Sequence, residues 1–143
     1  MTRQYGYSIV VPVLNEEEVL NEFYKRLTAV MDGLRENYEI IFVNDGSTDN
    51  SLEIMKKMSS NDGRVKIIDF SRNFGHQIAI TAGIDYASGE AVVTIDVDLQ
   101  DPPEVIAELV KKWKEGYAVV YAVRQERKGE NFFKKATASQ FFP

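Results

Sequence analysis

The sequence contains no cysteine and a single histidine among its 143 residues. Disulfides, thiolate nucleophiles, iron–sulfur clusters and zinc sites built from cysteine and histidine are therefore excluded. Any metal ion must be held mainly by oxygen ligands, which favours Mg²⁺, Mn²⁺ or Ca²⁺. These absences narrow the available chemistry before any motif is considered.

Long apolar runs and an excess of positive charge are also missing. No run approaches the roughly 20 residues that a membrane helix needs, and the N-terminus lacks the pattern of a signal peptide. The 17 basic residues are outnumbered by 22 acidic ones, which argues against a nucleic-acid partner. The hydrophobic fraction of 44% is typical of globular proteins, so we expect one soluble domain spanning residues 1–143.

Short apolar runs alternate with longer amphipathic ones along the chain. Runs rich in β-branched residues predict strands at residues 7–12, 38–45, 65–70, 91–96 and 118–123. Helical spacing of apolar residues and capping signals predict helices at residues 17–34, 46–60, 76–87 and 102–116, and another from residue 130. Apolar strands separated by helices imply an α/β fold with a parallel sheet covered on both faces.

Polar clusters follow each of the five predicted strands. Their sequences are LNEEE, NDGSTD, SRNFGH, DVDLQD and RQERKGE. Because ligands of such sheets bind beyond the carboxyl ends of the strands, we expect these clusters to surround one crevice. This convergence is the strongest physical argument for a functional site.

The cluster after the fourth strand holds four carboxylates within nine residues. Asp96, Asp98 and Gln100 alternate along the chain, so on extended backbone their oxygen atoms would point to one side. A divalent cation that bridges a diphosphate would neutralise the two aspartates. The alternative is a solvated acidic turn in which Asp101 and Glu104 favour the dipole of the next helix. The segment alone leaves both interpretations open.

Residues after the first two strands also allow two interpretations. Asp45 could accept a hydrogen bond from a nucleobase, whereas the segment that follows it could simply cap a helix. Asn15 and Glu16 either begin a helix or form the polar rim of a base and ribose site.

Basic residues after the third and fifth strands are similarly ambiguous. A lone histidine such as His76 is more often structural than a ligand, whereas Arg72 beside an acidic crevice could contact a phosphate. Arg124 and Arg127 either bind an anionic acceptor or belong to a solvated basic stretch.

Taken together and in order, these segments resemble the family-2 glycosyltransferases. The matching pieces are SIVVPVLNEEEVL, EIIFVNDGSTDNSLEIM, IIDFSRNFGHQIAITAGIDYASGEAVVTIDVDLQDPPEVI and YAVVYAVRQERKGENFFKK. SRNFGHQ and DVDLQDPPE are most similar to polyprenyl-phosphate sugar transferases, such as undecaprenyl-phosphate glucosyltransferase-like proteins and dolichol-phosphate mannose synthase. The resemblance implies the GT-A nucleotide-diphospho-sugar transferase fold, which is a Rossmann-like, mostly parallel sheet with helices on both faces.

The resemblance also implies roles for particular residues. The nucleotide-sugar would be bound by Pro12, Asn15, Glu16, Asp45, Arg72, His76, Asp96, Val97 and Asp98. Asp96, Asp98 and Gln100 would hold Mg²⁺ or Mn²⁺ against the donor diphosphate. Asp101, close enough to touch the donor sugar, would join Asp96 and Asp98 as a catalytic residue. Arg124 and Arg127 would contact the acceptor phosphate.

The implied reaction is a metal-dependent, inverting transfer of sugar from a nucleotide-diphospho-sugar to a polyprenyl phosphate or another acceptor. UDP-glucose or a similar UDP-sugar is favoured over GDP-mannose as the donor. A lipid phosphate is already ionised at pH 7, so the nucleophile needs little help from a general base. A homo-oligomer is compatible with the resemblance, and a nucleic-acid partner is not expected.

Members of this subfamily continue well beyond 143 residues, through an acceptor-binding region and usually membrane helices. We therefore expect this chain to carry the donor-binding half and to transfer sugar poorly, or not at all, by itself. The longer protein is expected at the cytoplasmic face of a membrane, which it would contact through the region missing here.

Three other classes of function compete with this interpretation. In a D-x-D phosphatase or phosphotransferase Asp96 would be the nucleophile, but that motif should lie near the chain start, with more chain after it. A phospho-acceptor receiver domain should have its acidic pocket after the first strand. A nucleotide-binding module without transfer activity is the third alternative.

Overall fold

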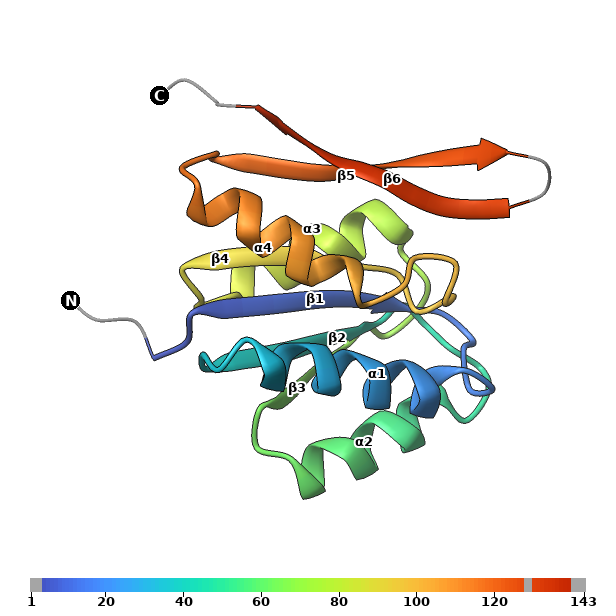
Figure 1. Ribbon diagram of the computed structural model, residues 1–143. Helices are drawn as coiled ribbons and strands as arrows, with labels where there is room; N and C mark the ends of the chain where they lie inside the picture. The colour runs from blue at the N-terminus through green and yellow to red at the C-terminus, as the bar shows by residue number, and fades with distance from the viewer. Residues whose placement is uncertain (1–3, 128–129, 140–143) are drawn as a thin grey trace.

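The computed structural model describes residues 4–127 and 130–139, with side chains described for residues 4–122. Figure 1 shows a sheet enclosed by helices and, beyond it, a hairpin of two strands. The larger sheet has four strands in the order β3-β2-β1-β4, and each neighbouring pair runs parallel. This confirms the predicted parallel sheet.

The elements from β1 to α4 lie close to their predicted positions. The strands of the sheet are β1 (Tyr7–Val13), β2 (Tyr38–Asn44), β3 (Val65–Asp69) and β4 (Ala91–Thr94). The helices are α1 (Leu20–Gly33), α2 (Ser51–Asn61), α3 (His76–Tyr86) and α4 (Val105–Lys114). The hairpin consists of β5 (Val119–Arg127) and β6 (Glu130–Ser139).

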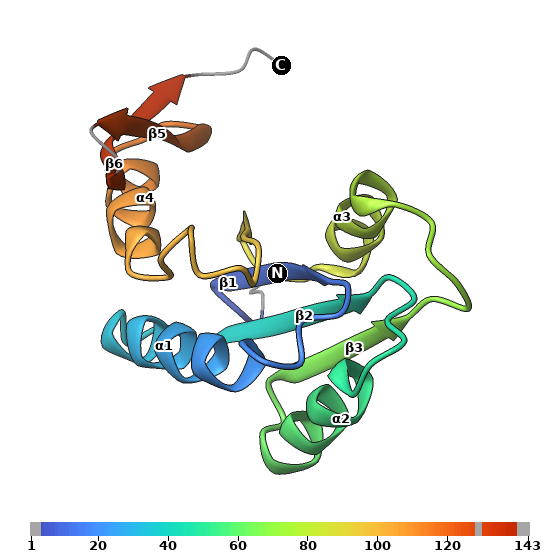
Figure 2. The ribbon, with the colours of Figure 1, turned by 90° about the vertical axis from the view of Figure 1, so that its right-hand side faces the viewer.

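The helices divide between the two faces of the sheet, with α1, α2 and α4 on one face and α3 on the other (Figure 2). Alternation along β1 explains this division, because successive side chains of a strand point to opposite faces. Ile9 and Val11 belong to the larger core, together with residues from α1, α2 and α4. Val10 points the other way and packs with Ala79 of α3 in a smaller core. The predicted helices on both faces are therefore confirmed.

The small residues of α3 let this helix approach β1 closely. Ala79 is fully buried, and a Cβ atom placed on Gly83 would lie 2.3 Å from Cγ1 of Val10. A larger side chain at that position would require Val10 or the helix to shift. The small-residue composition of α3 therefore reflects close helix–sheet packing.

A buried glutamate ties together the amino ends of the sheet strands. The Glu39 carboxylate accepts hydrogen bonds from Ser8 Oγ (2.5 Å), from the Ser88 amide and hydroxyl (both 2.8 Å) and from Lys66 Nζ (2.6 Å). Burial alone would raise the pKa of Glu39, but the hydrogen bonds from Lys66, Ser8 and Ser88 outweigh it and lower the pKa to about 2. These contacts fix the loop that enters β4.

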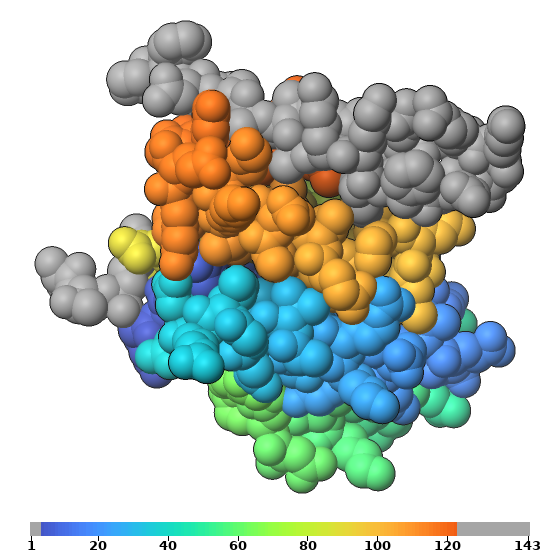
Figure 3. Space-filling model, viewed as in Figure 1, coloured from blue at the N-terminus to red at the C-terminus, as the bar shows by residue number. Residues whose placement is uncertain are grey.

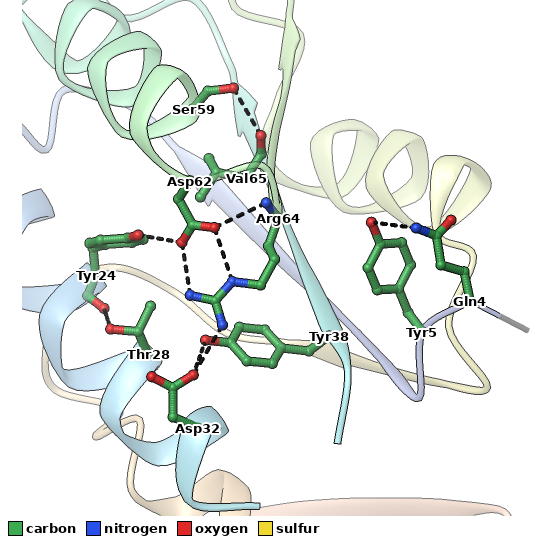
Figure 4. A network of polar contacts seen from close by, with 10 residues as sticks. All are labelled: Gln4, Tyr5, Tyr24, Thr28, Asp32, Tyr38, Ser59, Asp62, Arg64 and Val65. Carbon is green, nitrogen blue, oxygen red and sulfur yellow. Dashed lines mark hydrogen bonds and ion pairs between the residues drawn. The ribbon is translucent and has the colours of Figure 1, made fainter. Parts of the chain in front are cut away.

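A second polar cluster joins α1 to the turn between α2 and β3 (Figure 4). The Arg64 guanidinium forms a two-point contact with Asp62 (2.9 and 3.0 Å) and also donates to Asp32 (3.0 Å). It stacks on the ring of Tyr38, whose hydroxyl donates to Asp32 (2.8 Å). The bonds from Arg64 and Tyr24 lower the pKa of Asp62 to about 2, although its partial burial opposes this. We interpret this cluster as structural.

The C-terminal part of the chain differs from the prediction. Residues from 130 onward were expected to form a helix, but β6 pairs antiparallel with β5 in a separate sheet. Phenylalanine and threonine in this segment favour strands, and β5 supplies the hydrogen-bonding partner that local sequence patterns do not reveal. The fifth strand is also longer than predicted, so Arg124 and Arg127 lie within β5 and do not follow it.

An apolar cavity of about 630 Å³ lies between β4, α4 and β5. Among the strands that the structure describes, none pairs with the outer edge of β4.

Helices α1 and α4 lie against each other on the surface that Figure 3 shows. Arg26 of α1 forms an ion pair at 2.6 Å with Glu104, which directly precedes α4. None of the helices in the described part of the chain has the length and apolar character needed to cross a membrane.

Candidate functional site

A hollow of about 380 Å³ lies beyond the carboxyl ends of β1, β2 and β4, as the parallel sheet predicts. It is lined by Pro12, Val13, Leu14, Glu16, Asp45, Asn73, Gly75, His76, Asp96, Val97 and Asp98. Segments that are far apart in the sequence thus meet at one place. The larger cavity beside β4 is lined mostly by aliphatic and aromatic residues.

Acidic side chains dominate the electrostatics of the hollow. Partial burial raises the pKa of Glu16, and the nearby negative charges of Asp98 and Asp96 raise it further. These carboxylates therefore repel one another when no cation is present. Among the described side chains, no group of three or more His, Cys, Asp or Glu residues is arranged to hold a metal. A cation bound there would need further oxygen ligands, such as those of a diphosphate.

Asp96 and His76 form a direct contact across the hollow. Nε2 of His76 lies 2.9 Å from Oδ1 of Asp96. Both side chains remain accessible to solvent, with exposed fractions of 59% for His76 and 44% for Asp96. Between the two aspartates of the D-x-D motif, Val97 is buried, and so is Ile95 before Asp96. This burial anchors the backbone from which both carboxylates project.

Asp45 is buried and shapes the loop between β3 and α3. Its carboxylate accepts hydrogen bonds from the backbone amides of Phe74 (2.7 Å) and Gly75 (3.2 Å). Close by, a Cβ atom on Gly46 would lie 2.4 Å from the amide nitrogen of Asn73, so the two loops touch through backbone. Asp45 therefore lines the hollow and also anchors the residues that precede His76.

Asn15 does not line the hollow, in contrast to the other residues predicted after the first strand. It adopts a positive φ of 54°, and its Oδ1 accepts hydrogen bonds from the amides of Thr48 (2.7 Å) and Asp49 (3.2 Å). Its own amide donates to Ser47 Oγ (2.9 Å). Asn15 thus joins the loops after β1 and β2 and positions Glu16, the next residue.

Three other predicted residues lie outside the lining. The Arg72 guanidinium stacks over the Phe74 ring at 4.0 Å and donates to the Asn73 carbonyl oxygen. The backbone amide of Gln100 donates to Asp98 Oδ1 at 3.1 Å. Asp101 lines the apolar cavity beside β4.

The structure brings most of the predicted donor-site residues together. These are Pro12, Glu16, Asp45, His76, Asp96, Val97 and Asp98. The side chains of Arg124 and Arg127 lie outside the described residues. Sequence reasoning missed Leu14, Asn73 and Gly75, which also line the hollow. Asn73 and Gly75 belong to the SRNFGH cluster, whereas Leu14 looks like any apolar residue at a strand end.

Solved structures with a similar fold include glycosyltransferases of the GT-A class. A mannosyltransferase from Pyrobaculum calidifontis in complex with GDP-Man and Mn²⁺ matches with a TM-score of 0.71 and 21% identity, covering 87% of this chain and 37% of that one. S. aureus TarS in complex with UDP matches with a TM-score of 0.65 and 23% identity, covering 87% and 37%. The expected GT-A fold is confirmed.

The family model described as glycosyl transferase family 2 matches residues 8–142, and the chain belongs to this family. An uncharacterized glycosyltransferase of Bacillus subtilis, YkcC, is 68% identical over 142 residues, covering 99% of this chain and 44% of the relative. The bactoprenol glucosyl transferase of Shigella phage SfV is 44% identical over 135 residues, covering 94% and 44%. The chain thus spans less than half the length of these curated relatives.

Proposed function

We propose that this chain forms the donor-binding part of an enzyme that transfers a sugar from a nucleotide-diphospho-sugar to a polyprenyl phosphate. The observation that carries the proposal is the meeting of Glu16, Asp45, Asp96 and Asp98 in one hollow at the strand ends. The polyprenyl acceptor is supported by relatives named as a bactoprenol glucosyl transferase and an undecaprenyl-phosphate 4-deoxy-4-formamido-L-arabinose transferase.

The nucleotide part of the donor is assigned to the side of the hollow formed by the loops after β1 and β2. Pro12 lies near the end of β1, Glu16 follows β1, and Asp45 directly follows β2, so these residues would surround the base and ribose. We favour UDP-glucose or a similar UDP-sugar over GDP-mannose. Proteins of similar fold have been solved in complex with UDP and with GDP-Man, so the fold accommodates either nucleotide.

The diphosphate part is assigned to the D-x-D segment. Asp96 and Asp98, with Gln100, would hold Mg²⁺ or Mn²⁺. Burial and the negative charges of Asp98 and Asp96 together raise the pKa of Glu16, which fits a site that receives positive charge. When bound, such an ion supplies Lewis-acid stabilisation of the departing nucleoside diphosphate. The protein contributes two carboxylates on a backbone anchored by the buried Val97.

The acceptor would approach from the side of the hollow that lies toward β5. Its phosphate is already ionised near neutral pH, so the reaction needs no strong general base from the protein. Attack opposite the leaving diphosphate would invert the anomeric centre. We assign Arg124 and Arg127 to the acceptor phosphate and Asp101 to the region next to the donor sugar. We also place the longer protein at the cytoplasmic face of a membrane.

Thermal unfolding with candidate ligands tests the donor assignment. UDP, GDP, UDP-glucose and GDP-mannose are each added with and without Mn²⁺. A ligand that binds the folded state alone stabilises it by roughly 2.7 kcal/mol at 100 times its dissociation constant. We expect UDP and UDP-glucose to raise the melting temperature most, and to do so only with Mn²⁺.

Two matched variants localise the effect. Asp98→Asn should abolish the Mn²⁺-dependent shift, whereas Asp85→Asn, which removes the same charge from an exposed position on α3, should keep it. The donor assignment is wrong if no nucleotide shifts the transition or if Asp98→Asn behaves like the wild type.

A further inference from the structure

We propose that His76 is a positioning residue that holds one oxygen of Asp96 and so presents the other oxygen to the donor-bound cation. The proposal rests on the proposed function, because it assigns His76 a role toward the metal that Asp96 would hold. Its starting point is the distance of 2.9 Å between His76 Nε2 and Asp96 Oδ1. A carboxylate oxygen can only accept, so Nε2 carries the proton and donates it to this hydrogen bond.

The imidazole ring is held in place from its own side of the hollow. His76 is the first residue of α3 and follows Gly75, whose φ of 109° favours glycine. The amides of Phe74 and Gly75 both donate to the buried carboxylate of Asp45. Asp45 therefore fixes the turn that precedes His76. This turn positions the imidazole ring next to Asp96.

The backbone at Asp96 is anchored, but the Asp96 side chain is partly exposed to solvent. The amide of Ile95 donates to the Val10 carbonyl oxygen at 3.1 Å, and Ile95 and Val97 are both buried. The Asp96 carboxylate itself is 44% exposed, so without a partner it would rotate. The contact with His76 occupies Oδ1 and restricts that rotation.

The choice of a histidine matters for the charge of the site. Among the described residues, no lysine or arginine forms an ion pair with Asp96 or Asp98. An imidazole N–H donates to one oxygen of a carboxylate, and the second oxygen stays available to a divalent cation. Partners that orient metal-binding groups in this way change metal affinity by about 10- to 100-fold when removed.

Equilibrium binding of Mn²⁺ together with UDP tests the proposal without an activity assay. Calorimetric titration compares the wild type, His76→Ala and His76→Gln, because the glutamine side chain keeps an N–H donor of similar reach. We expect His76→Ala to weaken Mn²⁺ binding about tenfold or more and His76→Gln to stay within a few-fold of the wild type. Gln77→Ala, at the exposed neighbouring position, should bind like the wild type.

Binding of UDP without Mn²⁺ separates positioning from direct nucleotide contact. Positioning predicts that His76→Ala leaves this metal-free affinity unchanged. The proposal is overturned if His76→Ala binds Mn²⁺ like the wild type, if His76→Gln loses as much affinity as His76→Ala, or if metal-free UDP binding falls equally.

Asp96→Asn distinguishes failure of this inference from failure of the donor site. If Asp96→Asn and the wild type bind Mn²⁺ and UDP equally, the proposed function fails and the positioning role fails with it. If Asp96→Asn loses binding but His76→Ala does not, the donor site stands and the role of His76 is wrong.

Discussion

Glu39 has a stabilising role at the end of the sheet opposite the candidate site. A fully buried carboxylate is unfavourable unless its charge and its hydrogen-bonding capacity are satisfied. Here Ser8, Lys66 and Ser88 all donate to it, and Gly89 donates in turn to Ser8 Oγ at 2.7 Å. One side chain thus joins three strands of the sheet.

Glu39→Gln should lower the free energy of unfolding by about 2–3 kcal/mol, because bonds to a charged acceptor are among the strongest side-chain hydrogen bonds. Urea denaturation at neutral pH measures the change. Glu90→Gln, which removes an equal charge from an exposed position, should change stability by less than about 0.5 kcal/mol. Equal effects of the two variants would show that the network contributes nothing.

The stabilisation by Glu39 should also depend on pH. Its pKa is about 2 in the folded protein and 4.5 for the unperturbed group, so the unfolded state takes up the proton first. The stabilisation is therefore complete above pH 4.5 and is lost as the pH falls toward 2. The stability difference between wild type and Glu39→Gln should shrink over this interval. A difference that stays constant from pH 5 to pH 2.5 would contradict the assignment.

Close packing between α3 and β1 places the first residue of α3, His76, beside the candidate site. Gly83→Ala would bring a methyl group against Val10, and overpacking of this kind costs about 1–3 kcal/mol. Gly33, at the end of α1, has nothing within 4 Å of an added Cβ atom, so Gly33→Ala is the matched control and should not destabilise. Thermal denaturation of both variants checks this. If Gly83→Ala is as stable as Gly33→Ala, α3 does not pack as described.

The elements from β1 to α4 could be predicted because their apolar periodicity is local. The hollow could be predicted as well, because parallel strands bring their carboxyl ends to one edge of the sheet. Strand β6 could not, because its stability depends on pairing with β5. The role of Asn15 was also missed, since its positive φ and its bonds to Thr48 and Asp49 depend on the tertiary arrangement of two loops. Likewise, no sequence pattern shows that Asp101 lines a different cavity.

In the molecule as a whole, the two ends of the sheet differ in the polar groups they carry. The amino ends are tied by the Glu39 network, and the Arg64 cluster adds ion pairs between α1 and the α2–β3 turn. The carboxyl ends carry the acidic hollow, whose walls are loops joined through Asn15 and Asp45. Hydrogen bonds and ion pairs thus stabilise the amino ends of the strands, and the acidic hollow lies at their carboxyl ends.

The most direct test of the donor-site claim is to locate bound Mn²⁺ by its paramagnetic broadening of amide NMR signals in the presence of UDP. We predict strong broadening at His76, Val97 and Asp98, with signals of Ser8 and Ser88 at the opposite end of the sheet retained. Asp98→Asn should remove the effect. Broadening centred on the amino ends, or none at all, would contradict a donor site at the carboxyl ends of β1, β2 and β4.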